Sequence, residues 1–141
     1  MKTRVAWILA SVLLAGCNRL DTPERLADRF TDLYFVETDQ ARARALTSGL
    51  AEKKIDDELR LVGEVRRTMT SDMQKPTVEW DRRNIETHGE RARATYDLRI
   101  RQGGDDSRRV LQVGMQRMSG KWTISNFSVE ELPPGGLPQR R

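Results

Sequence analysis

The segment from residue 91 to residue 101 alternates with a period of two, and this pattern limits the fold more than any other feature of the sequence. The even-numbered positions are apolar, namely Ala92, Ala94, Tyr96, Leu98 and Ile100. The odd-numbered positions are polar or charged, namely Arg91, Arg93, Thr95, Asp97, Arg99 and Arg101. Successive side chains of a β-strand point to opposite faces of the sheet. The pattern therefore predicts a strand with one buried and one solvated face, which is typical of an antiparallel sheet covered on a single side.

Three more segments after Pro76 have the same short alternating character, namely residues 76–89, 107–120 and 121–132. Glycine-rich turn sequences separate the last three strands, and they predict hairpins that join these strands into a meander. In the last segment Trp122 and Ile124 share one parity, whereas Phe127 and Val129 share the other. A β-bulge near Ser125-Asn126 would bring all four onto one face.

The chain before residue 67 has a helical period instead. The sequence "DTPE" supplies Asp21 or Thr22 as an N-cap, and Pro23 suits the first turn. Apolar residues then recur at i, i+4 and i+7, which predicts a helix to about Val36. We expect a short helix within residues 40–47. A third helix should run to about Arg67, with its buried side formed by Leu50, Ile55, Leu59, Val62 and Val65.

Helices followed by an antiparallel sheet with one apolar face predict an α+β fold, in which the N-terminal helices pack on one face of a curved four-stranded sheet. The sequence "GKWTISNFSVEE", preceded by two long strands and by a helix, a short helix and a helix, resembles the nuclear transport factor two-like (NTF2-like, cystatin-like) superfamily of cone-shaped domains. This resemblance covers residues 22–132. It implies a cone interior lined by Phe30, Tyr34, Tyr96, Leu98 and Trp122.

The first residues have the order of an export signal. Lys2 and Arg4 precede an apolar run from Val5 to Ala15. This run is shorter than the about 20 residues that a membrane-spanning helix needs. The sequence Leu14-Ala15-Gly16-Cys17 resembles the lipobox of bacterial lipoproteins. The resemblance implies cleavage before Cys17, a diacylglyceryl group on its thiol and an acyl chain such as palmitate on its amino group, and we expect no other cofactor.

Residues 1–16 are therefore interpreted as a lipoprotein signal peptide and residues 17–21 as the lipidated Cys and its tether. Residues 22–132 form the α+β domain, and residues 133–141 form a disordered tail. We expect a lipid-anchored protein on the periplasmic side of the bacterial cell envelope. Asn18 differs from the Asp that resembles an inner-membrane retention signal, which favours the outer membrane. There are two alternatives to a lipidated Cys17. The signal could be an ordinary cleaved one with a coincidental Cys after it, or Cys17 could be a buried core residue.

The charge of the whole chain, +4 with a pI of about 9.6, includes the two basic residues of the signal. Its removal leaves 23 basic and 21 acidic side chains. Because an exported protein meets anionic head groups and cell-wall polymers, we expect no nucleic acid partner. The expected partners are membrane lipid through the Cys17 anchor and an envelope protein or anionic lipid. A homodimer formed through the sheet is also consistent with the sequence.

No catalytic constellation is visible in the sequence. NTF2-like enzymes such as ketosteroid isomerase-like proteins combine a helix Tyr with desolvated carboxylates. Tyr34 could point into the cone, but Asp97 has the parity of the arginines and should face water. His88 is the only histidine, and with a single Cys it cannot form the usual zinc site. We expect a non-enzymatic binding or scaffold module. The alternative is a pocket enzyme of the ketosteroid isomerase or dehydratase type.

The sheet should carry four arginines on its solvated face, namely Arg91, Arg93, Arg99 and Arg101. Their guanidinium groups could bind a phosphate or carboxylate at two points. The alternative is that acidic residues on neighbouring strands neutralise them, namely Glu79, Asp81, Glu86 and Asp97. The interior of the cone distinguishes between the possible functions. A wide polar pocket would favour a ligand-binding protein or an enzyme, and a filled cone would favour a scaffold.

Overall fold

The computed structural model describes residues 20–66 and 75–133. The predicted signal peptide, its lipobox residues Leu14, Ala15 and Gly16, the acylated Cys17 and residues 134–141 of the tail lie outside the described residues. Lipidation and the disordered tail therefore stay predictions. Among the described residues, no helix is both long and apolar enough to cross a bilayer.

The first helix, α1 (Pro23–Thr31), continues directly into a π-helical turn, η1 (Asp32–Val36). Thr22 is the N-cap, and its Oγ1 accepts a hydrogen bond from the Arg25 N–H at 3.4 Å. The predicted helix to Val36 is confirmed in length. Its last turn is wider than expected, because the Glu37 N–H donates to the Asp32 carbonyl five residues earlier.

The short helix α2 (Gln40–Arg44) is capped by Asp39, whose Oδ1 accepts from the Arg42 N–H at 3.1 Å. The third helix, α3 (Gly49–Arg66), ends within one residue of its predicted end. Both predicted helices are thus confirmed.

The prediction that Leu50 lies on the buried side of α3 is wrong, because its side chain is 62 % exposed. The helix packs through Ala51 and Ile55, which are both fully buried, and through Leu59, which is partly buried against the core. These residues recur every four positions. Leu50 precedes Ala51 by one residue, about 100° around the helix, and therefore points to solvent.

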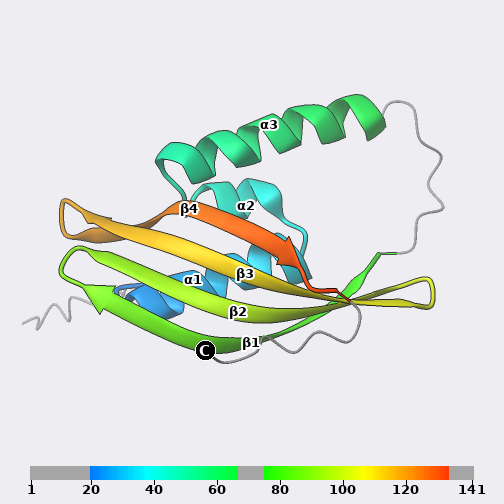
Figure 1. Cartoon of the computed structure of the whole chain (residues 1–141). Helices are drawn as coiled ribbons and strands as arrows, with labels where there is room; N and C mark the ends of the chain where they lie inside the picture. Colours follow the sequence, from blue (N-terminus) through cyan, green and yellow to red (C-terminus); the bar gives the residue numbers. More distant parts are fainter. Residues whose placement is uncertain (1–19, 67–74, 134–141) are drawn as a thin grey trace, which may run out of the picture.

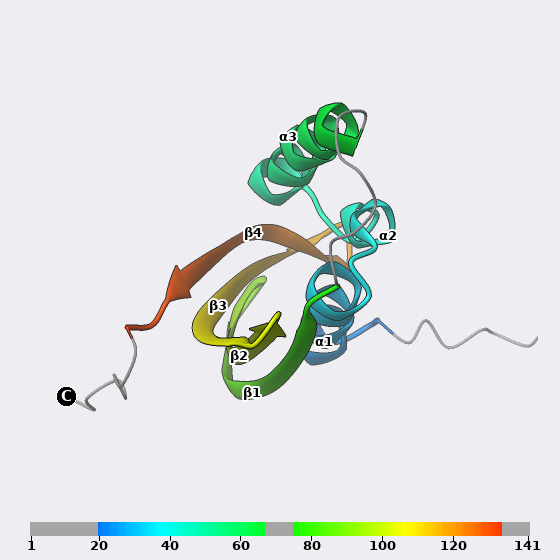
Figure 2. The same cartoon turned by 90° about the vertical axis from the view of Figure 1, so that its right-hand side faces the viewer.

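The C-terminal half is a four-stranded antiparallel sheet in the order β1-β2-β3-β4. The strands are β1 (Thr77–His88), β2 (Arg91–Gln102), β3 (Asp105–Met118) and β4 (Lys121–Glu131). Figure 1 shows the meander, and Figure 2 shows the sheet curving so that α1 lies on its concave side while α3 lies over β4. The predicted α+β fold is confirmed. His88 is the last residue of β1, and the turn that follows is Gly89-Glu90.

Two bulges interrupt the register of the sheet. Gly114 pairs with Asn126 and Met115 pairs with Ile124, so Ser125 is the extra residue of β4 and the predicted bulge is confirmed. A second bulge in β1 was not predicted: Arg82 pairs with Tyr96 and Asn84 with Thr95, which leaves Arg83 without a counterpart. Each bulge increases the local twist of the sheet.

The core lies between the concave face of the sheet and α1, with α2 and α3 completing it. The fully or almost fully buried side chains come from every strand except β1, and from all three helices: Leu26, Phe30, Leu33, Ala43, Ile55, Tyr96, Leu98, Leu111, Val113 and Ile124. Phe127 is 6 % exposed and joins them because of the bulge at Ser125.

Candidate functional site

The face of the sheet opposite α1, called the outer face below, carries three transverse rows of polar side chains. Antiparallel register places Glu86, Arg93, Gly114 and Asn126 side by side in the central row. The row on one side contains His88, Arg91, Gln116 and Thr123, and the row on the other side contains Asn84, Thr95, Gln112 and Ser128. Charged and amide groups that are far apart in the sequence therefore meet on this face.

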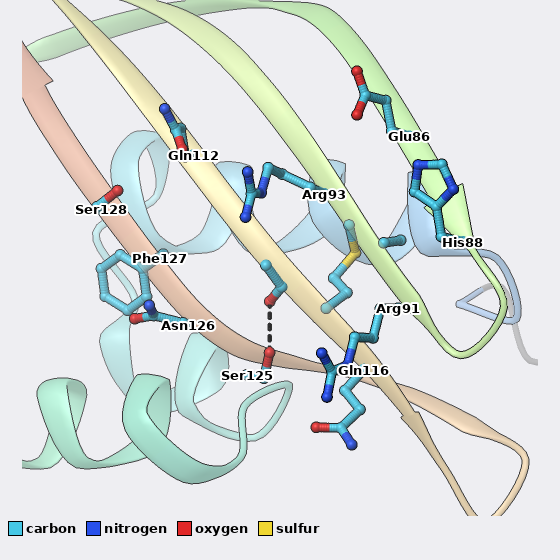
Figure 3. A pocket seen from close by; sticks show the side chains of 13 residues that line it. Glu86, His88, Arg91, Arg93, Gln112, Gln116, Ser125, Asn126, Phe127 and Ser128 are labelled. Atoms are coloured by element: carbon cyan, nitrogen blue, oxygen red, sulfur yellow. Dashed lines mark hydrogen bonds between the residues drawn. The ribbon is translucent and has the colours of Figure 1, made fainter.

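Gly114 occupies the middle of the central row and contributes no side chain, so the outer face is hollowed there. The resulting hollow, called the Gly114 hollow, has a volume of about 590 Å³. Its rim residues include Arg91, Arg93, Gln112, Gln116, Asn126 and Ser128. The bulge shapes its floor, because the Ser125 hydroxyl lies beneath the hollow and donates to the Gly114 carbonyl at 3.2 Å (Figure 3).

The structure divides the four predicted arginines into two pairs. Arg99 forms an ion pair with Asp106, with its Nε 2.9 Å from Oδ2, and Arg101 forms one with Glu79. The hydrogen bond from Arg99 lowers the pKa of the Asp106 carboxyl below its usual value. Arg91 and Arg93 are exposed, and within residues 20–66 and 75–133 they form no ion pair or side-chain hydrogen bond.

Arg91 and Arg93 line the rim of the Gly114 hollow, whereas Arg99 and Arg101 do not line it. Figure 3 shows the guanidinium groups of Arg91 and Arg93 extending from β2 toward β3, with Gln116 beside Arg91. A guanidinium group can donate two parallel hydrogen bonds to one carboxylate or phosphate. The amides of Gln112 and Gln116 can both donate and accept around such a group. The amide of Asn126 can donate, and its Oδ1 accepts from Lys54 Nζ at 3.0 Å. The arrangement is therefore suited to bind an anionic group.

The five residues predicted to line the cone have a different environment. Phe30, Tyr96 and Leu98 are at most 2 % exposed, and Trp122 is 8 % exposed. Tyr34 is half-buried at the edge of this cluster, where its ring stacks on Phe30 with a centroid distance of 5.5 Å. Trp122 lines a hollow beside Leu20 and Lys121. At the level of Phe30 and Tyr96 the interior is filled by side chains.

Three carboxylates that sequence reasoning missed line the margin of the core, all from helical segments. Glu58 accepts a hydrogen bond from the Tyr34 hydroxyl, and Asp28 accepts one from the Tyr96 hydroxyl at 2.8 Å. Asp32 accepts the Trp80 Nε1–H at 2.9 Å. Asp28 and Asp32 are four residues apart and flank the apolar stripe of α1, which is the one signal that could have indicated their position.

The tyrosine hydroxyls are held in the neutral form. Burial, and secondarily the hydrogen bond to Glu58, raises the pKa of Tyr34 far above its usual value. Burial and the hydrogen bond to Asp28 raise the pKa of Tyr96 in the same way. Asp97 lies on the outer face as predicted, where Arg83 Nε donates to its Oδ2 at 3.1 Å. Asp97 is thus separated from Tyr34 by the sheet.

No group of three or more His, Cys, Asp or Glu side chains could hold a metal ion within the ranges that the structure describes. His88 lies at the rim of the Gly114 hollow, near Glu86 (Figure 3).

Helices on the concave side of a curved four-stranded meander define the cone-shaped α+β fold of NTF2-like domains. The solved structure of a designed NTF2-like protein, Rd1NTF2_05 with five substitutions, superposes with a TM-score of 0.53 over 78 % of this chain and 97 % of that chain. The two sequences are 16 % identical, so the similarity concerns the fold alone. No family model matches the chain, and a search of curated proteins finds no match.

Proposed function

We propose that the chain is a lipid-anchored, non-enzymatic binding module of the bacterial cell envelope, and that it holds an anionic partner in the Gly114 hollow. The observation that carries this proposal is the contrast between the two arginine pairs. Arg99 and Arg101 are neutralised by neighbouring carboxylates, while Arg91 and Arg93 are exposed and uncommitted at the edge of an open hollow. The fold that the chain shares with the designed NTF2-like protein is compatible with a binding module.

The proposed anchor is supported by the lipobox-like sequence that ends at Cys17. Two or three acyl chains on one residue make membrane association stable without a spanning helix. A Cys17→Ser variant should leave the membrane fraction and should lose the mass of the acyl groups. If the variant fractionates with membranes like the parent and shows no mass difference, the anchor is wrong.

The proposed partner is an anionic macromolecule of the envelope, recognised through its carboxylate or phosphate groups. The Arg91→Glu/Arg93→Glu double variant tests this in the full chain held in detergent micelles. Binding to poly-glutamate and to inorganic phosphate is measured by titration calorimetry. We expect the affinity for poly-glutamate to fall about tenfold or more, because two charge-assisted hydrogen-bond donors are replaced by acids.

The Arg99→Glu/Arg101→Glu variant is a matched control, because it makes the same change of charge on the same face. Equal losses in both variants would show that net charge, and not the hollow, determines binding. Gly114→Gln is a second test, since a Cβ at residue 114 meets its nearest atom, the Asn126 carbonyl oxygen, at an ordinary 3.6 Å. Its side chain should fill the hollow and weaken binding while the fold is kept.

The hydrogen bond from Tyr34 to Glu58 is the one observation that favours the alternative, a pocket enzyme of the ketosteroid isomerase type. It brings a carboxylate to the helix tyrosine as such chemistry requires. Against this reading, the raised pKa of Tyr34 makes its hydroxyl a poor acid near neutral pH. Exchange of the α-protons of a cyclic enone for deuterium, lost in a Glu58→Gln variant, would establish the enzyme instead.

A further inference from the structure

One end of the domain combines the start of the described chain with two hairpin turns, and it is called the tether end below. The β1–β2 turn is Gly89-Glu90, and the β3–β4 turn is Ser119-Gly120. Leu20 and Asp21 share a hollow of about 320 Å³ with Ser119, Gly120 and Lys121. In Figure 1 the two turns and the beginning of α1 lie at the same end of the sheet, and the β2–β3 turn lies at the other.

Leu20 limits how far this end can lie from an acylated Cys17. Its side chain is partly buried against the core, so the chain is held to the domain from that residue onward. Two residues, Asn18 and Arg19, lie between Cys17 and Leu20. The three residue-to-residue steps from Cys17 to Leu20 extend at most about 11 Å. This step rests on the acylation that the proposed function includes. Given that acylation, the tether end lies against the membrane surface.

The tether end carries the side-chain chemistry that suits a lipid surface. Met118 is 52 % exposed at the tip of the β3–β4 hairpin. Arg117 and Lys121 flank it, and neither forms an ion pair with a carboxylate in the described part of the chain, including nearby Asp21 and Glu90. An apolar side chain between two cations can enter the headgroup layer while the cations contact anionic lipid.

Among the residues that the structure describes, two arginines at the opposite end are paired with carboxylates. There Arg99 and Arg101 are neutralised by Asp106 and Glu79, close to the β2–β3 turn. We infer that the tether end docks on an anionic bilayer, with Met118 at headgroup level and Arg117 and Lys121 against lipid phosphates. In this orientation the strands stand away from the membrane, and the Gly114 hollow opens sideways to envelope partners.

Two single-cysteine reporters test the orientation in the full chain. Glu90→Cys places a fluorophore at the tether end, and Asp105→Cys places one beside the β2–β3 turn. Each change removes one carboxylate, and the 12 residues of β2 separate the sites by about 40 Å. Because Cys17 is the only native cysteine and its thiol is acylated in this scheme, each reporter is the only free thiol.

The labelled chains are reconstituted in phosphatidylcholine vesicles with phosphatidylglycerol and a quencher attached to lipid head groups. We expect quenching at residue 90 to exceed quenching at residue 105 several-fold. Arg117→Glu/Lys121→Glu should reduce quenching at residue 90 without changing the membrane-bound fraction. Arg99→Glu/Arg101→Glu is the matched control and should leave both signals unchanged.

Failure of the docking and failure of the anchor give different results. Equal quenching at residues 90 and 105 in a membrane-bound chain overturns the docked orientation alone. Label uptake by the native chain, which would reveal a free Cys17 thiol, overturns the anchor and this inference with it. Quenching that is insensitive to the Arg117 and Lys121 reversal overturns the role of these cations.

Discussion

Both tyrosine hydroxyls of the chain donate hydrogen bonds to carboxylates, and this feature predicts an alkaline limit to stability. The sequence contains two tyrosines. Burial, reinforced by Glu58 for Tyr34 and by Asp28 for Tyr96, raises the pKa of both hydroxyls in the folded state. In the unfolded chain they ionise near the ordinary value of about 10. Stability is therefore fully present below about pH 10 and is lost as the pH rises above it.

The magnitude follows from the number of protons involved. Above about pH 10 the unfolded state releases up to two protons that the folded state retains, and each proton lowers the free energy of unfolding by about 1.4 kcal/mol per pH unit. The native protein should thus lose about 2.7 kcal/mol per pH unit. Tyr34→Phe and Tyr96→Phe should each halve this slope, because each removes one of the two protons.

Urea unfolding at a series of pH values around and above about 10 measures the slope. Near-ultraviolet absorbance of tyrosinate, recorded on the same samples, reports the ionisation of these two residues alone. We expect the tyrosinate signal to appear together with the loss of circular dichroism. A tyrosinate signal that rises near about pH 10 while the fold and the urea midpoint stay native would refute the reasoning.

Four further substitutions probe the packing by urea denaturation. Ile55→Ala removes a fully buried side chain and should lower the free energy of unfolding by about 2–5 kcal/mol, whereas Leu50→Ala, at a position 62 % exposed, should change it by less than about 0.5 kcal/mol. Trp80→Phe removes the indole donor to Asp32 and should cost about 1–2 kcal/mol, with a loss near zero contradicting the hydrogen bond. Gly49→Ala should cost about 1–2 kcal/mol, because the backbone there has a φ of +59°, although a Cβ would meet the Ser125 carbonyl oxygen at an ordinary 3.9 Å.

The fold was predictable where a local pattern determines it. The alternation around Tyr96 identified the buried face of β2, and the change of parity between Ile124 and Phe127 required the bulge that the register shows at Ser125. Each of these inferences needs only the chain near the residue concerned. Leu50 was wrongly assigned to the buried side of α3, because the apolar stripe that contains Ile55 was continued back to it. The packed face of the helix passes through Ala51 instead.

The candidate site was predictable only in part, because it depends on register between strands. Parity alone placed Arg91, Arg93, Arg99 and Arg101 on one face, but it could not show which of them meet a carboxylate. Arg99 pairs with Asp106 because the β2–β3 turn sets those strands in register. The hollow likewise arises because Gly114 falls between Arg93 and Asn126 across three strands.

The carboxylates that accept hydrogen bonds from the two tyrosines were not predicted, for a related reason. Glu58 has the polar character of an exposed helix residue, and its contact with Tyr34 spans 24 residues of sequence. Asp28 is separated from Tyr96 by 68 residues. Which carboxylate meets which tyrosine depends on how the helices pack on the sheet. The sequence pattern predicts that the helices cover the sheet, but not which side chains come into contact.

The extra residue Arg83 in β1 has a consequence for self-association. β1 is an outermost strand of the sheet, so its free backbone groups could template the addition of a strand from another molecule. The irregularity at Arg83 interrupts the straight ladder that such an addition needs. Addition of a strand at this edge is thereby discouraged, while β4 forms the other edge of the sheet.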